Sequence, residues 1–271
     1  MDLDGTLLTS DKRISPASEC ILRRVREAGV QIVLASARPP RSVMAFYTQL
    51  DLDTPMINYN GALVYDPPSQ RVLAHRPIPT GVAVEIVRDA RARHPDVVVS
   101  AEVLDRWFTD RVDERFQTET ARHCRPDVLA PIDDWLTQPV TKLLLLGEQA
   151  TLTSLRKHVA RAYEHQVAMV QTEGFLLQIM HATTSKAQAL REVAAELGVR
   201  REETLAIGDN ANDVGMLQWA GVSVAVANAC PDALSVAHFV TDHHDQDGAA
   251  LAVENLILSP QSPVLRRDNR T

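Results

Sequence analysis

The chain has 271 residues, of which 45% are hydrophobic, 23% are charged and 4% are aromatic. This length and composition are typical of a folded protein with one large domain or two modest ones, and they exclude a disordered chain. Its net charge of −7 argues against general nucleic-acid binding, because phosphate backbones demand a basic surface. No apolar run reaches the roughly 18 residues of a membrane span and no signal peptide is visible, so we expect a cytoplasmic location.

The first 60 residues predict alternating helices and strands. A helix is expected to begin after Ser15, which is suited to an N-cap, and to end at Gly29. The elements that follow are a buried strand, a helix and a strand, over residues 30–35, 41–50 and 56–58. This order is typical of a parallel α/β sheet.

After residue 60 the pattern changes to hairpins mixed with helices, which predicts an α+β insert. Its expected elements are a hairpin over 62–65 and 72–74, helices over 80–93 and 152–163, and strands over 96–101, 105–109, 143–146, 167–171 and 176–180. From Lys186 the α/β alternation returns, with helices over 187–197 and 249–258 and strands over 204–207 and 222–226. The polar tail, 259–271, is expected to be frayed.

Two segments offer carboxylates in pairs. Asp2 and Asp4 stand two residues apart, before a glycine, and such a pair can supply a nucleophile and an acid/base group. Asp209 and Asp213 stand four apart where a predicted strand enters a helix, and can hold a hard cation such as Mg²⁺. Taken singly, these pairs can also be a solvated acidic terminus and a capped helix start.

Two further residues could bind an anion. Ser36 follows the strand predicted over 30–35, where a hydroxyl and backbone N–H groups are available. Lys186 begins a predicted helix and could hold a phosphate as a point charge. Alone, each is more often a loop serine or a surface lysine. All four segments fall at predicted strand ends, where open α/β sheets place their sites, so together they predict one site.

Other candidate groups in the sequence are weaker. The cysteines Cys20, Cys124 and Cys230 are few and far apart, which predicts reduced thiols and no disulfide framework. A run of two histidines and an aspartate, His243-His244-Asp245, could be considered for metal binding. Because adjacent histidines are expected to point apart, we interpret it as a surface loop.

The chemically active segments resemble the four motifs of the haloacid dehalogenase (HAD) superfamily and, more narrowly, of its Cof-type phosphatases. The resemblance covers nearly the whole chain in order. It implies an α/β fold: a Rossmann-like core with a parallel sheet over 1–62 and 182–271, and an α+β C2-type cap over 63–181. The motifs that carry it are Asp2-Leu3-Asp4-Gly5-Thr6-Leu7, Ser36-Ala37-Arg38, Lys186 and Gly208-Asp209-Asn210-Ala211-Asn212-Asp213, with Asn60-Gly61-Ala62 and Ala227-Asn228-Ala229 in support.

The resemblance implies a Mg²⁺-dependent hydrolase of small phosphate monoesters, such as sugar phosphates or related metabolites, without nucleic-acid or membrane partners. Asp2 would attack phosphorus and form an aspartyl-phosphate. Asp4 would protonate the leaving oxygen and then deprotonate the hydrolytic water. Mg²⁺ would be held by Asp2, the Asp4 carbonyl, Asp209 and Asp213. The phosphoryl oxygens would be bound by Ser36, Lys186, Asn212 and the backbone N–H groups of Leu3 and Ala37.

The family also places a buried apolar strand before its first aspartate, whereas only Met1 precedes Asp2 here. We therefore expect a sheet that lacks its first strand, and a native protein that starts several codons upstream. Two other functions stay open: a phosphoryl transferase or mutase of the same superfamily, and a truncated, inactive member that acts as a binding protein. The substrate is not readable, and the cap residues Glu102, Arg106, Lys142 and Glu173 are candidates by location alone.

Overall fold

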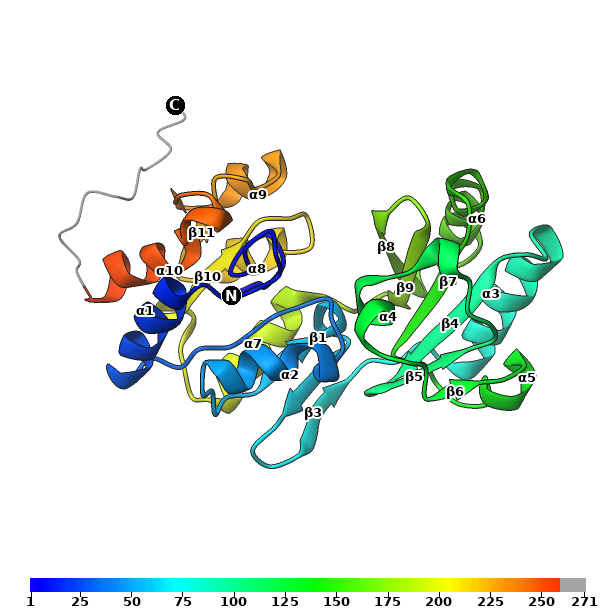
Figure 1. Ribbon diagram of the computed structural model, residues 1–271, viewed down its shortest axis with the longest axis horizontal. Coiled ribbons are helices and arrows are strands. Elements are labelled where there is room, and N and C mark those ends of the chain that lie inside the picture. The colour runs from blue at the N-terminus through cyan, green and yellow to red at the C-terminus, as the bar shows by residue number, and fades with distance from the viewer. Residues whose placement is uncertain (259–271) are drawn as a thin grey trace. The chain divides into compact units, whose positions relative to one another are not determined.

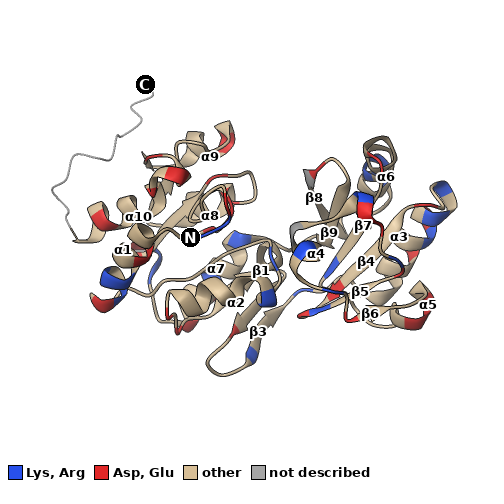
Figure 2. Cartoon of the chain, viewed as in Figure 1, with Lys and Arg blue, Asp and Glu red and all other residues tan. Residues whose placement is uncertain are grey.

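The computed structural model describes residues 1–258, with the side chains of Glu119 and Thr172 excepted, so the tail that we expected to be frayed lies outside the described residues. The chain divides into two compact units (Figure 1). One comprises Met1–Leu73 and the chain from Ser185 onward, and the other comprises Ala74–Thr184. No described helix has the length and apolar character needed to cross a membrane. Basic and acidic residues are interspersed along elements of both units (Figure 2).

The first unit contains most of the helices. In α1, Pro16–Glu27, the Ser15 side chain accepts the backbone N–H of Ser18, as the sequence predicted for an N-cap. Apolar residues of this helix, such as Leu22 and Val25, face the core. The other helices of this unit are α2, Pro40–Gln49, α7, Lys186–Glu196, α8, Val214–Trp219, α9, Pro231–Val236, and α10, Gly248–Val253.

Two small sheets belong to this unit. The strands β10, β11 and β12 pair in parallel and in that order, which agrees with the predicted α/β core. The strands β1, β2 and β3 form a second sheet, in which β1 and β2 are antiparallel. The strands β2 and β3 join this unit through the pairing of β2 with β1. The first unit therefore extends to Leu73, beyond the boundary that we expected at residue 62. The bounds are β1, Met56–Asn58, β2, Leu63–Asp66, β3, Arg71–His75, β10, Leu205–Gly208, β11, Val222–Ala225, and β12, Phe239–Val240.

The apolar run over residues 30–35 is not a regular strand, so this part of the prediction was wrong. On one side, its pairing with β1 is limited to a parallel bridge between Ala35 and Ile57. On the other side, its neighbour is Met1, whose amino group donates to the Val33 carbonyl and whose carbonyl accepts the Ala35 N–H. A ladder of so few bonds leaves the segment extended but irregular.

The backbone of the first two residues connects this segment to β10. Asp2 N–H donates to the Ile207 carbonyl at 3.0 Å, so Met1 and Asp2 occupy a position between β10 and residues 33–35. An apolar groove of about 140 Å³ begins at Met1 and is lined by residues of both these segments. Its lining includes Ile32, Val33, Leu190, Val193, Leu205, Ile207 and Val253. This placement holds Asp2 at the carboxyl end of β10.

The second unit is built on one six-stranded sheet, in the order β6-β5-β4-β7-β9-β8. Its pairs are antiparallel except for β5 with β6, which fits the predicted α+β character. The strands are β4, Val98–Val103, β5, Arg106–Thr109, β6, Val128–Leu129, β7, Lys142–Leu146, β8, Val167–Glu173, and β9, Leu176–His181. The helices are α3, Thr80–Arg93, α4, Glu119–His123, α5, Ile132–Trp135, and α6, Gln149–Ala162.

Alternation along the strands separates the two faces of this sheet. The helices α3 and α6 cover one face of this sheet (Figure 1). On that face, Val99, Leu143 and Leu145 pack with apolar residues of both helices into one core. The opposite face buries Glu102, Lys142 and Gln178 beside the smaller apolar cluster of Val98, Leu144, Leu146 and Leu176.

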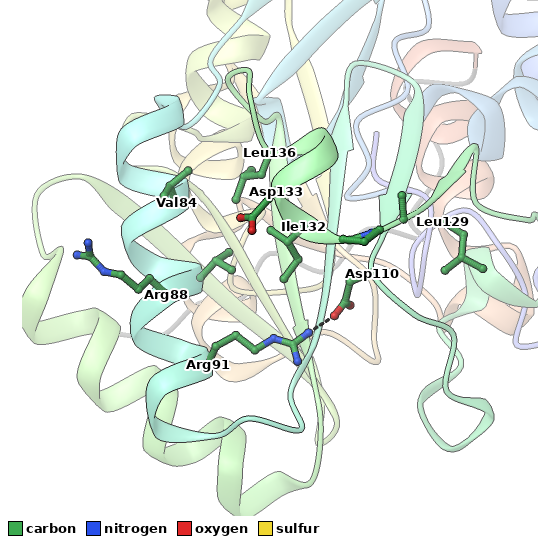
Figure 3. Close-up of a pocket in the computed structure, with 11 residues that line it drawn as sticks. Val84, Arg88, Arg91, Asp110, Leu129, Ile132, Asp133 and Leu136 are labelled. Atoms are coloured by element: carbon green, nitrogen blue, oxygen red, sulfur yellow. Dashed lines mark hydrogen bonds and ion pairs between the residues drawn. The ribbon is translucent and has the colours of Figure 1, made fainter.

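A pocket of about 840 Å³ lies between α3 and the segment that contains α5 (Figure 3). At its end, Arg91 forms an ion pair with Asp110, whose other oxygen accepts the Val99 N–H. The pair therefore ties the end of α3 to β4 and to the residue after β5.

Candidate active site

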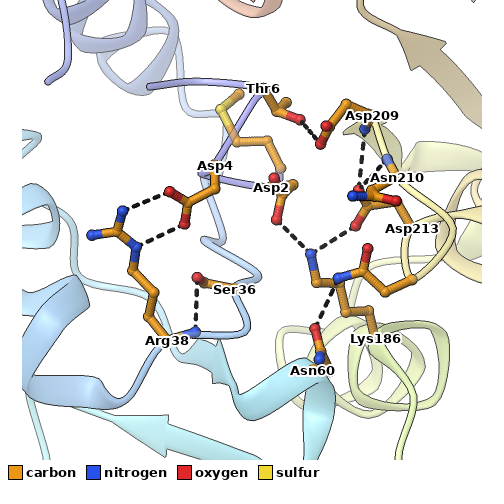
Figure 4. A network of polar contacts seen from close by, with 12 residues as sticks. Asp2, Asp4, Thr6, Ser36, Arg38, Asn60, Lys186, Asp209, Asn210 and Asp213 are labelled. Atoms are coloured by element: carbon orange, nitrogen blue, oxygen red, sulfur yellow. Dashed lines mark hydrogen bonds and ion pairs between the residues drawn. The ribbon is translucent and has the colours of Figure 1, made fainter. Parts of the chain in front are cut away.

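Three carboxylates and one ammonium converge at the carboxyl end of β10 (Figure 4). Asp209 directly follows β10 and Asp213 directly precedes α8, while Asp2 arrives from the start of the chain. Lys186, the first residue of α7, places its Nζ 2.5 Å from Asp2 Oδ1 and 2.7 Å from Asp213 Oδ1, with no exposed side-chain surface. The structure thus brings together Asp2, Asp209, Asp213 and Lys186, which the sequence placed far apart.

The start of α7 is fixed by local contacts. Ser185 caps the helix, because its hydroxyl accepts the backbone N–H of Gln188 at 3.0 Å. The short 3₁₀ turn of Tyr59–Gly61 packs against this cap, and a Cβ on Gly61 would lie 2.3 Å from the Ser185 carbonyl oxygen. Gly61 also has a φ of +97°. Only glycine satisfies both conditions, so this residue determines how closely α7 and Lys186 approach the site.

The loop after β10 is organised around Asp213. Its Oδ2 accepts the backbone N–H groups of Asp209 and Asn210, each at 3.1 Å, which leaves Oδ1 for Lys186. A Cβ on Gly208 would lie 2.6 Å from the Asp213 Cβ, so glycine is needed for this close packing. Asp213 is fully buried, and these bonds compensate for its desolvation.

The loop after Asp2 turns at Gly5 and returns toward Asp209. Gly5 has a φ of +77°, and a Cβ there would lie 2.6 Å from Asp209 Oδ2. The next residue, Thr6, donates its hydroxyl hydrogen to Asp209 Oδ1 at 2.9 Å. The turn therefore joins the first loop to the loop after β10.

The charges in the cluster do not balance. Burial raises the pKa of Asp2 to about 8, against the opposing effect of Lys186, and burial followed by Asp213 raises the pKa of Asp209. Burial alone would lower the pKa of Lys186, but the Asp2 and Asp213 carboxylates raise it above its usual value. When all three carboxylates are ionised, they exceed the Lys186 ammonium by two negative charges in a space of low dielectric, which is why burial opposes their ionisation.

This donor set fits a divalent cation. Oxygen atoms of Asp2, Asp209 and Asp213 all lie within 4.8 Å of one another, so one small ion can contact all three. Carboxylate oxygens are the ligands that Mg²⁺ prefers, and its charge would neutralise the excess.

Asp4, the second carboxylate of the first motif, lies in a different environment. It accepts two hydrogen bonds from Arg38, from Nε at 2.7 Å and from Nη2 at 2.6 Å, and a third from Lys12 Nζ at 3.0 Å (Figure 4). Burial acts against ionisation, but the Arg38 and Lys12 contacts prevail and lower the pKa of Asp4. In this arrangement Asp4 is a carboxylate held away from the cluster.

The residues predicted to bind phosphoryl oxygens lie in loops beside the cluster. Ser36 is buried and its Oγ accepts the backbone N–H of Arg38 at 3.1 Å, while Ala37 is half-buried next to it. Asn212 donates to the Asn60 Oδ1 at 2.9 Å. Leu3 lies between the two aspartates of the first motif, with its side chain in the core. Their role toward phosphate stays a prediction.

Several supporting residues were missing from the predicted site. They are Lys12 and Arg38, which hold Asp4, Thr6, which holds Asp209, Asn60, which contacts Asn212, and Asn228, whose amide donates to the Gly5 carbonyl at 2.8 Å. Four of them lie inside the segments that carried the family resemblance, so their position in those motifs was an available signal. Lys12 had no comparable signal.

Comparison with known proteins agrees with this geometry. The sequence model of the haloacid dehalogenase-like hydrolases matches residues 1–253. The chain is 29% identical to the pyridoxal phosphate phosphatase of Escherichia coli, over 92% of this chain and 94% of the relative. It is 27% identical to the 5-amino-6-(5-phospho-D-ribitylamino)uracil phosphatase of Bacillus subtilis, over 92% and 93%.

Solved structures give the same result. The fold is similar to that of a haloacid dehalogenase-like hydrolase from Bacteroides thetaiotaomicron, with a TM-score of 0.86, 26% identity and coverage of 94% of this chain and 97% of that one. A crystal structure from Thermotoga maritima matches with a TM-score of 0.83 and 26% identity, over 94% and 95%. The chain therefore belongs to the haloacid dehalogenase-like hydrolases, and the prediction of a phosphatase of this superfamily is confirmed.

Proposed function

We propose that the protein hydrolyses small phosphate monoesters through a covalent intermediate on Asp2. The observation that carries this proposal is the buried Lys186 ammonium, shared between Asp2 and Asp213 beside Asp209. An aspartate can attack an anionic phosphate only where positive charge offsets the repulsion. This cluster combines a nucleophile, a fixed cation and an oxygen-rich site for a second cation.

Mg²⁺ fits this site, where Asp2, Asp209 and Asp213 would hold it together with the Asp4 backbone carbonyl. When bound, it supplies charge stabilisation for the phosphoryl group in transfer. Lys186, Ser36, Asn212 and the backbone N–H groups of Leu3 and Ala37 would orient the phosphoryl oxygens, so that phosphorus faces Asp2.

The proposed reaction has two displacements. In the first, an Asp2 carboxylate oxygen forms a bond to phosphorus while the ester P–O bond breaks, and Asp4 donates a proton to the departing oxygen. In the second, Asp4 accepts a proton from water as the water oxygen attacks phosphorus, which releases Asp2 and inorganic phosphate. Asp4 loses its proton in the first step and regains one in the second, so it is unchanged over the full cycle.

The contact between Asp4 and Arg38 bears on the first displacement. A carboxylate with a lowered pKa is suited to accept a proton and poorly suited to donate one. Asp4 must therefore leave Arg38 or share its contacts before it acts as the acid. The ionised Asp4 of the described arrangement is the form that the proposed second displacement requires.

The substrate class is a small phosphorylated metabolite. Two relatives that this chain matches over most of their length are named for phosphatase activity, one on pyridoxal phosphate and one on a ribityl phosphate. Both of these compounds are phosphate monoesters of small polar molecules. We place this protein in the same class, without assigning one ester.

The test is release of inorganic phosphate from a panel of sugar phosphates, nucleotides and pyridoxal phosphate, with Mg²⁺ or with EDTA. We expect turnover that needs Mg²⁺ and that falls by more than about 10³-fold in Asp2→Asn. Asp11→Asn, which alters an exposed carboxylate outside the cluster, is the matched control. Formation of an isomeric ester without free phosphate would favour a transferase, and no turnover of any ester would overturn the proposal.

The mechanism has a separate test. Rapid acid quenching after mixing with a ³²P-labelled ester should recover label on the peptide that contains Asp2. With an ester whose leaving group needs no proton, such as p-nitrophenyl phosphate, Asp4→Asn should increase this label, because the intermediate still forms but lacks the group that activates water. Absence of label in both proteins under active turnover would exclude the covalent route while leaving phosphatase activity intact.

A further inference from the structure

His243, His244 and Asp245 form a compact cluster in the loop that precedes α10. We had expected the two histidines to point apart, but their ring centroids lie 4.5 Å from each other. The reason is the short 3₁₀ turn of His244–Gln246, which starts directly after His243 and folds the two side chains toward one side. Asp245 completes the group, with Oδ2 at 3.8 Å from His243 Nδ1 and 3.7 Å from His244 Nε2.

The tautomer of His244 is determined by its surroundings. Its Nδ1 lies 2.7 Å from the Leu8 carbonyl oxygen, which can only accept, so Nδ1 carries the hydrogen. The Nε2 lone pair is therefore directed toward the cluster. A ligating histidine in proteins almost always donates its other N–H to a carbonyl or carboxylate in this manner.

Asp245 is oriented by a second pair of bonds. Ser10 donates its backbone N–H to Asp245 Oδ1 and its hydroxyl hydrogen to Asp245 Oδ2, both at 2.6 Å. A carboxylate oxygen that accepts one such bond retains a lone pair for a further partner. The single lone pair of His243 Nδ1 accepts the backbone N–H of Asp245 at 3.2 Å, so this one bond must be given up when Nδ1 binds an ion.

From these contacts we infer that His243, His244 and Asp245 form a transition-metal site of the zinc type, distinct from the acidic cluster. Two imidazoles and a carboxylate suit Zn²⁺, whereas Mg²⁺ prefers oxygen ligands alone. Ligand atoms in a tetrahedral zinc site lie about 3.4 Å apart, so the site closes when His243 exchanges its bond to the Asp245 N–H for the ion and its ring moves inward. His243 and Asp245 are also partly exposed, which gives an ion access from solvent.

The bound ion would act on the loop of the first motif. The cluster contacts Leu8 and Ser10 directly. The backbone N–H of His244 donates to Asn228 Oδ1 at 3.0 Å, and the Asn228 amide donates to the Gly5 carbonyl. An ion that binds only the folded arrangement stabilises it. We expect Zn²⁺ to slow amide exchange over residues 5–12.

The test is calorimetric titration of the full chain with Zn²⁺ in excess Mg²⁺, which keeps the acidic cluster occupied. One Zn²⁺ should bind per chain, and affinity should fall by at least about 100-fold in His244→Asn and His243→Asn. Ser10→Ala, which removes a bond to the ligand Asp245, should weaken binding by about 10–100-fold. His165→Gln, an exposed histidine of the other unit, should retain full affinity.

A second readout separates ligation from a structural role. The ¹⁵N shifts of the His243 and His244 imidazoles should move together when Zn²⁺ is added, while circular dichroism shows both variants folded. Zinc binding of unchanged affinity in folded His243→Asn and His244→Asn would overturn the inference. So would the absence of saturable binding to the wild-type protein in excess Mg²⁺.

Discussion

A fully buried lysine between two carboxylates is the least ordinary residue of this protein. Burying an ammonium is unfavourable unless it is paired, and Lys186 is paired twice, with Asp2 and Asp213. The same pairs leave each carboxylate dependent on Lys186. Removal of the Lys186 charge would therefore leave the buried carboxylates of Asp2 and Asp213 without a counter-charge.

Lys186→Met should lower the free energy of unfolding by about 3–5 kcal/mol in EDTA, because Asp2 and Asp213 lose their shared partner. The double variant Lys186→Met/Asp213→Asn should lose less than the sum of the two single changes. Urea unfolding in EDTA and in excess Mg²⁺ measures both effects, and Mg²⁺ should reduce the loss in Lys186→Met. An unchanged urea midpoint in the single variant would show that the pairs contribute nothing.

Gly5 offers a controlled comparison with Gly29. Both have a φ near +80°, so an alanine at either position carries a strain of about 1–2 kcal/mol. A Cβ at Gly29 meets nothing within 4 Å, whereas one at Gly5 would collide with Asp209. Gly5→Ala should therefore lose activity as well as stability, and Gly29→Ala stability alone. Equal phosphate release by the two variants would contradict this reading.

At the level of elements, the sequence predicted most helices and strands of both units, including β1 at its observed bounds. It failed at residues 30–35, because an apolar run shows that a segment is buried and not whether a neighbour is available to pair with it. It also missed short elements such as α4, α5 and β12, which are too brief for a periodic pattern. The candidate site residues were predicted from the motifs. Lys12 lies outside these motifs, and its contact with Asp4 is visible only in the folded chain.

The N-cap of α7 should matter for both stability and chemistry. Ser185→Ala removes the acceptor for the Gln188 N–H, so we expect a loss of about 1 kcal/mol in thermal or urea unfolding. Because Lys186 is the first residue of this helix, fraying should also reduce phosphate release. Ser185→Asn, which retains a capping oxygen, should restore both quantities. A variant that loses stability but keeps full activity would show that Lys186 is positioned by its ion pairs alone.

His75, at the end of β3, should give the second unit a pH-dependent stability. Burial lowers its pKa, and its Nε2 lies 2.9 Å from Thr141 Oγ1, which also accepts the Leu104 N–H. The unfolded chain has a histidine pKa of about 6.5 and so binds more protons below that pH. The free energy of unfolding should therefore decrease as the pH is lowered from about 7.5 to about 5.5.

His75→Gln should flatten this fall, as seen by comparing melting temperatures at the two pH values. The exposed His165→Gln serves as the control, because it changes the histidine count without touching β3. If His75→Gln and wild type lost the same number of degrees, His75 would have no part in the pH response.

For the whole molecule, the division into two units limits what a ligand at the acidic cluster can stabilise. Every carboxylate of the cluster belongs to the first unit, and the core of Val99, Leu143 and Leu145 belongs entirely to the second. The sequence predicted this division from the change between α/β alternation and hairpins. The boundary near residue 73 depends on pairing between β1 and β2, which periodicity cannot show.

Mg²⁺ should therefore protect the two units unequally. A ligand that binds only the folded state stabilises by about 2.7 kcal/mol at a concentration one hundred times its Kd, and this stabilisation should act on the unit that holds Asp2, Asp209 and Asp213. Hydrogen exchange measured by mass spectrometry, in EDTA and in Mg²⁺, should show slower exchange in residues 2–8 and 205–213. Residues 98–103 and 142–146 should change little, because their core contains no ligand of the ion. Equal protection of both sets would mean that the two units unfold as one cooperative body, and protection of neither would remove the acidic cluster as the Mg²⁺ site.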